Sequence, residues 1–192
     1  MLSISWGMNG THPLIAEALD RAINNGVIIV AAAPNKTYSP MTFPANYNRV
    51  FCIGSAYGDG RLAGSNPSNG KEEKFCALGQ GVRIPWTSGS IQTPDKNRLV
   101  GGGENYRYDA GTSTATAVAA GIASLFVDYM RQIMDYGRGP QNYEYMRKLF
   151  LEMSKHASGQ EYRFLAPWSL FQQKEYKRII KRILSDGIYC IF

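Results

Sequence analysis

The sequence is poor in cysteine and histidine and has no long hydrophobic run, and each shortage excludes a class of protein. Its 192 residues include three cysteines, Cys52, Cys76 and Cys190, without metal-ligand spacing, so neither a disulfide framework nor a metal site is expected. No apolar run approaches the roughly 20 residues of a membrane span, so no transmembrane segment is expected. No basic segment followed by an apolar stretch opens the sequence, so we expect no signal peptide and the localisation stays open. The two histidines, His12 and His156, are the only imidazoles available for acid–base chemistry.

The composition is that of a folded protein with an uneven charge. Hydrophobic residues make up 44% of the chain and aromatic residues 12%, enough to bury a core of ordinary domain size. Residues 1–130 hold 10 Lys and Arg against 9 Asp and Glu, whereas residues 131–192 hold 11 against 6. A nearly neutral body, 1–135, is therefore expected to precede a helical basic extension of unknown role, 136–192, with a soft boundary at the Gly-rich segment 136–140. Binding to nucleic acid is not expected.

The first 33 residues follow a strand, helix, strand pattern. A short strand in 1–7 precedes an amphipathic helix in 11–26, with Thr11 as its N-cap and Asn25-Gly26 as its stop. The apolar run 27–33 is typical of a strand covered on both faces. Such a unit predicts an α/β fold, a parallel sheet with helices on both faces. Further strands are expected within 48–56 and 79–85, and further helices over 113–131, 140–157 and 174–184.

Ser113 stands in an unusual setting, because Gly-Thr-Ser directly precedes a run of alanines. A serine in the first turn of a helix has unpaired backbone N–H groups beside it, and the helix dipole there favours a developing negative charge. An acyl-transfer nucleophile needs both, together with a base. The plainer alternative is that Gly-Thr-Ser is only a helix-capping motif.

Asn35 follows the apolar run 27–33, at the end of a buried strand. Ligand sites of open α/β sheets lie beyond the carboxyl ends of the strands. A side-chain amide is a neutral donor suited to an oxyanion. The alternative interpretation is an ordinary turn asparagine.

Four segments, SISWG, GVIIVAAAPN, FPANYNRVFCIGSA and GTSTATAVAAG, occur in an order and at separations that resemble the C-terminal half of the subtilisin-like serine protease (subtilase) domain. The resemblance covers about residues 2–130. It implies a serine-type endopeptidase that hydrolyses peptide bonds of peptide or protein substrates through an acyl-enzyme at Ser113. Asn35 and the Ser113 N–H would be the oxyanion donors.

The same resemblance implies which residues bind substrate. Ser5, Trp6 and Gly7 would form the edge that pairs with the substrate backbone. Together with these three residues, Ala32, Ala33 and Pro34 would line the specificity pocket. Pro34 replaces a small residue of the family and restricts the backbone before Asn35. No cofactor is expected; calcium is possible through the family resemblance alone.

The base and the acid of the triad are missing from this sequence. In subtilisin order both precede the serine, and neither His12 nor His156 stands in the family's His-Gly-Thr setting. The 192 residues alone are therefore expected to be inactive. The alternative is a non-catalytic remnant that binds peptides along Ser5, Trp6 and Gly7.

The basic segment 174–184 has two interpretations. It is either a helix packed on the body with a solvated basic face, or a contact for an anionic surface.

Overall fold

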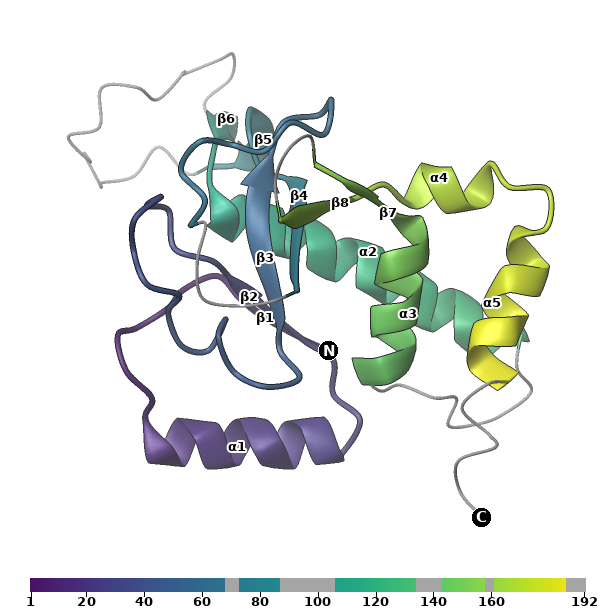
Figure 1. Ribbon diagram of the computed structural model, residues 1–192, viewed down its shortest axis with the longest axis horizontal. Helices are drawn as coiled ribbons and strands as arrows, with labels where there is room; N and C mark the ends of the chain where they lie inside the picture. Colours follow the sequence, from purple (N-terminus) through teal and green to yellow (C-terminus); the bar gives the residue numbers. More distant parts are fainter. Residues whose placement is uncertain (68–72, 87–105, 134–142, 158–160, 186–192) are drawn as a thin grey trace.

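The computed structural model describes residues 1–67, 73–86, 106–133, 143–157 and 161–185 (Figure 1). Its strands are β1 (Leu2–Ile4), β2 (Ile29–Ala32), β3 (Phe51–Ala56), β4 (Lys74–Leu78), β5 (Val82–Pro85), β6 (Tyr106–Asp109), β7 (Ser154–His156) and β8 (Tyr162–Leu165). Its helices are α1 (Pro13–Asn24), α2 (Thr112–Ile133), α3 (Tyr143–Met153), α4 (Pro167–Phe171) and α5 (Tyr176–Ser185). The expected boundary segment 136–140 and Cys190 lie outside the described residues.

The main sheet has six strands in the order β1-β2-β3-β4-β8-β7. The first five are parallel, with Ser3 opposite Val30 and Val30 opposite Phe51, and β7 adds an antiparallel edge. All residues of β2 and β3 are buried, because helices cover both sides of these strands. A separate antiparallel ribbon pairs β5 with β6.

Hydrophobic clusters lie on both faces of the sheet. On one face, Leu19 and Ile23 of α1 pack with Ile29, Ala31 and Cys52. On the other face, α2, α3 and α5 pack against the alternate side chains of β2, β3 and β4. Figure 1 shows α1 well apart from the group of α3, α4 and α5. The predicted fold class, α/β with a parallel sheet and helices on both faces, is confirmed, and the antiparallel strand β7 is an addition that was not expected.

Helix α2 owes its position to small side chains. Ala115, Ala119 and Ala123 are fully buried, which lets the helix lie close to the sheet. Phe126 and Met130 then fill the wider space beyond the sheet. By length and composition alone, Thr112–Gln132 would also be able to cross a membrane. A core helix meets the same criterion, and α2 contacts β1, β2, β3 and β4.

The basic extension contributes strands as well as helices, although only helices were expected there. Strand β8 pairs with β4, so it belongs to the main sheet. Arg147 of α3 donates two hydrogen bonds to Glu73, and the buried Lys74 forms an ion pair with Glu161. Interactions between distant parts of the sequence therefore join this segment to the body.

Two details of the predicted helix ends are wrong. Helix α1 begins at Pro13 with His12, not Thr11, at the N-cap and without a side-chain cap hydrogen bond. Helix α3 ends at Met153, and His156 lies in β7 instead of ending a helix. Helix α3 ends early because residues 154–156 pair with 163–165 in an antiparallel ladder.

Candidate functional site

Ser113 lies where the carboxyl end of β1 meets the first turn of α2. Its side chain is exposed, and its Oγ donates a hydrogen bond to the Ser5 carbonyl oxygen at 2.9 Å. In return the Ser5 Oγ donates to the Ser113 carbonyl oxygen at 3.0 Å. This reciprocal pair ties the end of β1 to the start of the helix.

Asn35 reaches the same place from the carboxyl end of β2. Its Oδ1 accepts a hydrogen bond from the Thr112 N–H at 2.9 Å, which satisfies one of the N–H groups that a helix start leaves unpaired. Because the oxygen of the amide is committed, the Nδ2 group is left as the donor. The structure thus brings Asn35 and Ser113 together, across 78 residues of sequence.

Two glycines that sequence analysis did not single out let these segments approach. Gly111 has a φ of +138°, and a Cβ there would lie 3.3 Å from the Asn35 Oδ1. The Gly111 N–H donates to the Gly79 carbonyl oxygen at 2.7 Å. A Cβ on Gly79 would come within 2.6 Å of the Gly111 oxygen and 2.8 Å of the Ala115 Cβ. The available signal was the glycine directly before Thr-Ser; nothing in the local sequence marks Gly79.

The residues expected to bind substrate fall into two groups. Ser5, Trp6 and Gly7 are exposed, with Trp6 at 53%. A Cβ on Gly7 would lie 2.4 Å from the Thr42 Oγ1, so this glycine permits a close approach of the neighbouring segment.

The second group follows β2. Ala32 and Ala33 are buried, and the Ala33 N–H donates to the Ile53 carbonyl oxygen at 2.9 Å. Pro34 is half-buried and leads into the exposed Asn35. Little side-chain surface of the two alanines is therefore open to a ligand, whereas the Ser5–Gly7 backbone is accessible.

Neither histidine takes part in this arrangement. His12 precedes α1, where its carbonyl oxygen accepts from the Ala16 N–H. His156 lies in β7, at the edge of the sheet opposite β1, with its Nε2 2.8 Å from Arg163 Nη1. Within the described ranges, no group of three or more His, Cys, Asp or Glu side chains is placed to hold a metal ion.

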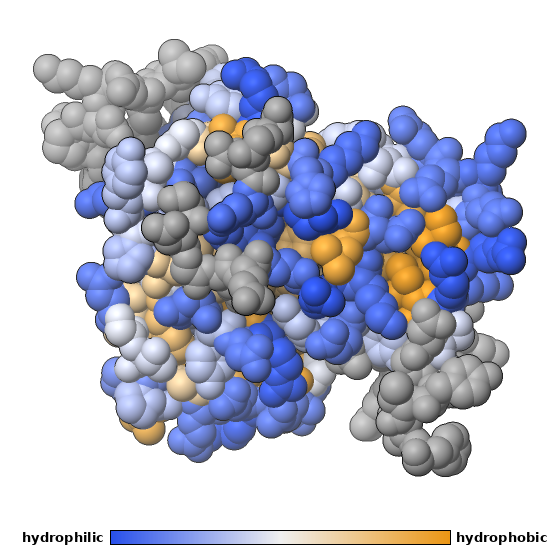
Figure 2. Space-filling model, in the orientation of Figure 1, coloured by the Kyte–Doolittle hydropathy of each residue, from blue (hydrophilic) through white to orange (hydrophobic). Residues whose placement is uncertain are grey.

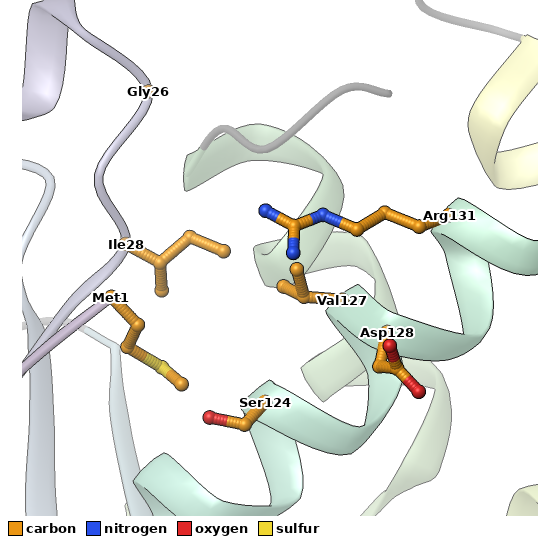
Figure 3. A pocket seen from close by; sticks show the side chains of 7 residues that line it. All are labelled: Met1, Gly26, Ile28, Ser124, Val127, Asp128 and Arg131. Atoms are coloured by element: carbon orange, nitrogen blue, oxygen red, sulfur yellow. The ribbon is translucent and has the colours of Figure 1, made fainter. Parts of the chain in front are cut away.

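A cavity of about 180 Å³ lies at the other end of α2 and the first strands. It is lined by Met1, Gly26, Ile28, Ser124, Val127, Asp128 and Arg131. Figure 3 shows the Arg131 side chain reaching past Val127 toward the chain before β2. Ser124 follows Ser113 by 11 residues, roughly 16 Å along the helix axis. The cavity is therefore separate from the serine site.

Comparison with known proteins identifies the family of the chain. The subtilase family model matches residues 1–149. The thermostable alkaline protease of Halalkalibacterium halodurans is 28% identical over 125 residues, which are 65% of this chain and 30% of that protein. The major intracellular serine protease of Bacillus subtilis is 26% identical, with 94% of this chain and 54% of the relative covered.

Solved protease structures share the fold. The S218A mutant of the PatA protease domain superposes with a TM-score of 0.69 at 19% identity, covering 94% of this chain and 60% of that one. Fervidolysin from Fervidobacterium pennivorans, a keratinolytic enzyme related to subtilisin, gives 0.66 at 22%, covering 88% and 26%. This chain thus spans about a fifth to a half of the length of the sequence relatives it matches.

Proposed function

The chain belongs to the subtilase family, and on that premise we propose that it is the serine-bearing part of a subtilisin-like endopeptidase. Ser113 Oγ attacks the carbonyl carbon of a peptide bond and forms an acyl-enzyme ester, the amine leaves with a proton, and water then hydrolyses the ester. Asn35 Nδ2 and the Ser113 N–H stabilise the oxyanion. The observation that carries the proposal is the hydrogen bond from Thr112 N–H to Asn35 Oδ1, because it aims the amide donor at the start of the serine helix.

The proton of Ser113 has no base to receive it within the described residues. Its hydrogen bond goes to the Ser5 carbonyl oxygen, which is far too weak a base to hold a proton. Loss of the base from such a triad costs several orders of magnitude in kcat, as known for subtilisin itself. These 192 residues alone are therefore expected to be almost inactive, and the base and acid must come from polypeptide outside them.

The edge of the sheet beside Ser113 supports an origin of the base outside the chain. Among the residues that the structure describes, strand β1 pairs with β2 alone. The Leu2 N–H donates to Ile28, so strand alternation turns the N–H and C=O of Ser3 toward the open side. On α2, which packs against β1, Leu125 is 73% exposed. An open edge of this kind pairs readily with another strand.

A serine-directed fluorophosphonate tests the nucleophile without the rest of the triad. The reagent should label the peptide that contains Ser113 slowly, and added imidazole should accelerate the labelling because it supplies a soluble base. Mass spectrometry of the digested protein locates the adduct. Ser5→Ala, which removes the neighbouring hydroxyl, should still be labelled at Ser113, whereas Ser113→Ala should not react. Equal labelling of Ser113→Ala, or no adduct at Ser113 with imidazole present, would contradict the proposal.

A non-catalytic peptide-binding module is the second candidate. The observation that favours it is the exposed Ser5–Trp6–Gly7 segment beside a serine whose hydroxyl is bonded to backbone. A module of this kind would bind an extended peptide with an affinity unchanged by Ser113→Ala and reduced by Trp6→Ala. Fluorescence anisotropy with a labelled peptide library measures both. An affinity that collapses in Ser113→Ala would speak against the module.

A further inference from the structure

A basic surface lies on α5 and the residues just before it. Five cations and one carboxylate occur between residues 172 and 185, and all six side chains are exposed. They are Lys174, Lys177, Arg178, Lys181, Arg182 and Glu175. Glu175 accepts a hydrogen bond from Arg178, so the surface carries a strong excess of positive charge.

Helix α5 is oriented with its apolar side toward the protein core and its cationic side toward solvent. Ile180, Ile183 and Leu184 are buried against α3 and α2. The apolar side of α5 is therefore occupied and cannot turn toward a ligand. Lys177 and Lys181 of α5 are four residues apart, a spacing that places helical side chains on one face, and Lys174 lies in the turn just before the helix. The cations of α5 thus form an array.

Two aromatic side chains lie on α4, the element that precedes this array. Trp168 and Phe171 are three residues apart on α4 and each is 48% exposed. The Phe171 ring lies 5.6 Å from that of Tyr176, the first residue of α5. Figure 2 shows an apolar patch rimmed by hydrophilic side chains at the same end of the molecule, where Figure 1 places α4 and α5.

We propose that this surface, formed by Trp168, Phe171 and the cations of residues 174–182, docks on a lipid bilayer that contains anionic headgroups. Each lysine or arginine near such a surface contributes favourable binding free energy, and tryptophan and phenylalanine partition into the membrane interface. The exposed aromatic side chains favour a bilayer over an acidic peptide, because the cations by themselves would be enough to bind an acidic peptide.

The docking surface is remote from the serine site. The Phe171 ring stacks on Phe126 of α2 at 5.4 Å. Phe126 follows Ser113 by 13 residues, roughly 20 Å along the helix axis. A bound bilayer would therefore leave the Ser5–Gly7 edge open, and the inference does not depend on catalysis by Ser113.

Vesicle co-sedimentation of the full chain tests the inference. Vesicles of phosphatidylcholine alone are compared with vesicles that also contain phosphatidylglycerol, at low and at raised salt. The wild-type chain should bind only the anionic vesicles, and raised salt should weaken that binding. The Lys177→Gln/Lys181→Gln variant should bind about 25-fold more weakly, because each lysine near an anionic surface contributes about five-fold. Trp168→Ser should also bind less.

A matched control removes the same charge elsewhere. The Lys36→Gln/Arg131→Gln variant changes two exposed cations outside the surface and should bind nearly as the wild type does. Equal loss in this control would show that net charge alone decides, and would overturn the inference. Binding to neutral vesicles, or indifference to salt, would overturn it as well. Binding to polyglutamate without binding to vesicles would assign the surface to an acidic polypeptide instead.

Discussion

Replacing Phe150 with alanine should show that the sheet and the C-terminal segment unfold together. Phe150 of α3 is fully buried, and its ring centroid lies 4.9 Å from that of Phe51 on β3 and 5.2 Å from that of Phe75 on β4. One side chain of the basic extension thus packs against two neighbouring strands of the body. Its removal should destabilise both parts at once.

The expected size follows from burial. Truncation of a fully buried phenylalanine costs about 3–5 kcal/mol, a large fraction of the total stability of an ordinary domain. For a chain of this length each kcal/mol lowers Tm by about 2–4 °C. The Phe150→Ala variant should therefore melt about 6–20 °C below the wild type.

Calorimetry and circular dichroism measure the transition, with Phe171→Ala as the matched control. Phe171 is half-exposed, so its truncation should cost less than half as much. The wild type and both variants should each unfold in one transition. Two transitions, of which Phe150→Ala shifts only the one that reports residues 143–185, would refute a shared core.

The remaining predictions concern the serine site and the thiols. Asn35→Asp keeps the oxygen that accepts from Thr112 but loses the Nδ2 donor, so imidazole-assisted fluorophosphonate labelling of Ser113 should slow by about 10²-fold or more, as known for the oxyanion asparagine of subtilisin; an unchanged rate would exclude this donor. Gly111→Ala should lower the unfolding free energy in urea by about 1–3 kcal/mol, because φ is +138° there; wild-type stability would contradict that strain. Cys52 and Cys76 are buried, and burial raises the pKa of Cys76 to about 12, so at pH 8 both should resist iodoacetamide until denaturant is added, as peptide mapping would show.

Some elements could be predicted from the sequence because their local hydrophobic pattern matches the burial of their side chains. The apolar run around Ile29–Ala32 and the one around Phe51–Ala56 became β2 and β3, since strands covered on both faces need no polar alternation. In 140–157 the apolar positions Met146, Leu149, Phe150 and Met153 are all buried, as their helical spacing predicts.

Other elements could not be predicted from the local sequence because residues far away in the sequence stabilise them. Strand β4 begins with Lys74, and a lysine is normally expected at the protein surface. Lys74 is buried here, where it forms an ion pair with Glu161, 87 residues away. Strand β8 holds only four residues and takes its conformation from pairing with β4 and β7. No window of local sequence contains these contacts.

The sequence by itself determined the family and the α/β class, because motif order and strand hydrophobicity are properties of the chain; the roles of Ser113 and Asn35 stay predictions from the same motifs. Only the tertiary structure decided that Asn35 Oδ1 bonds Thr112, that the Ser113 hydroxyl bonds Ser5, and that Gly79 and Gly111 must lack side chains. It also placed α4, through the contact of Phe171 with Phe126, near the end of α2 that is remote from Ser113. These relations join residues far apart in sequence, and steric exclusion and hydrogen-bond geometry act only once the chain has folded.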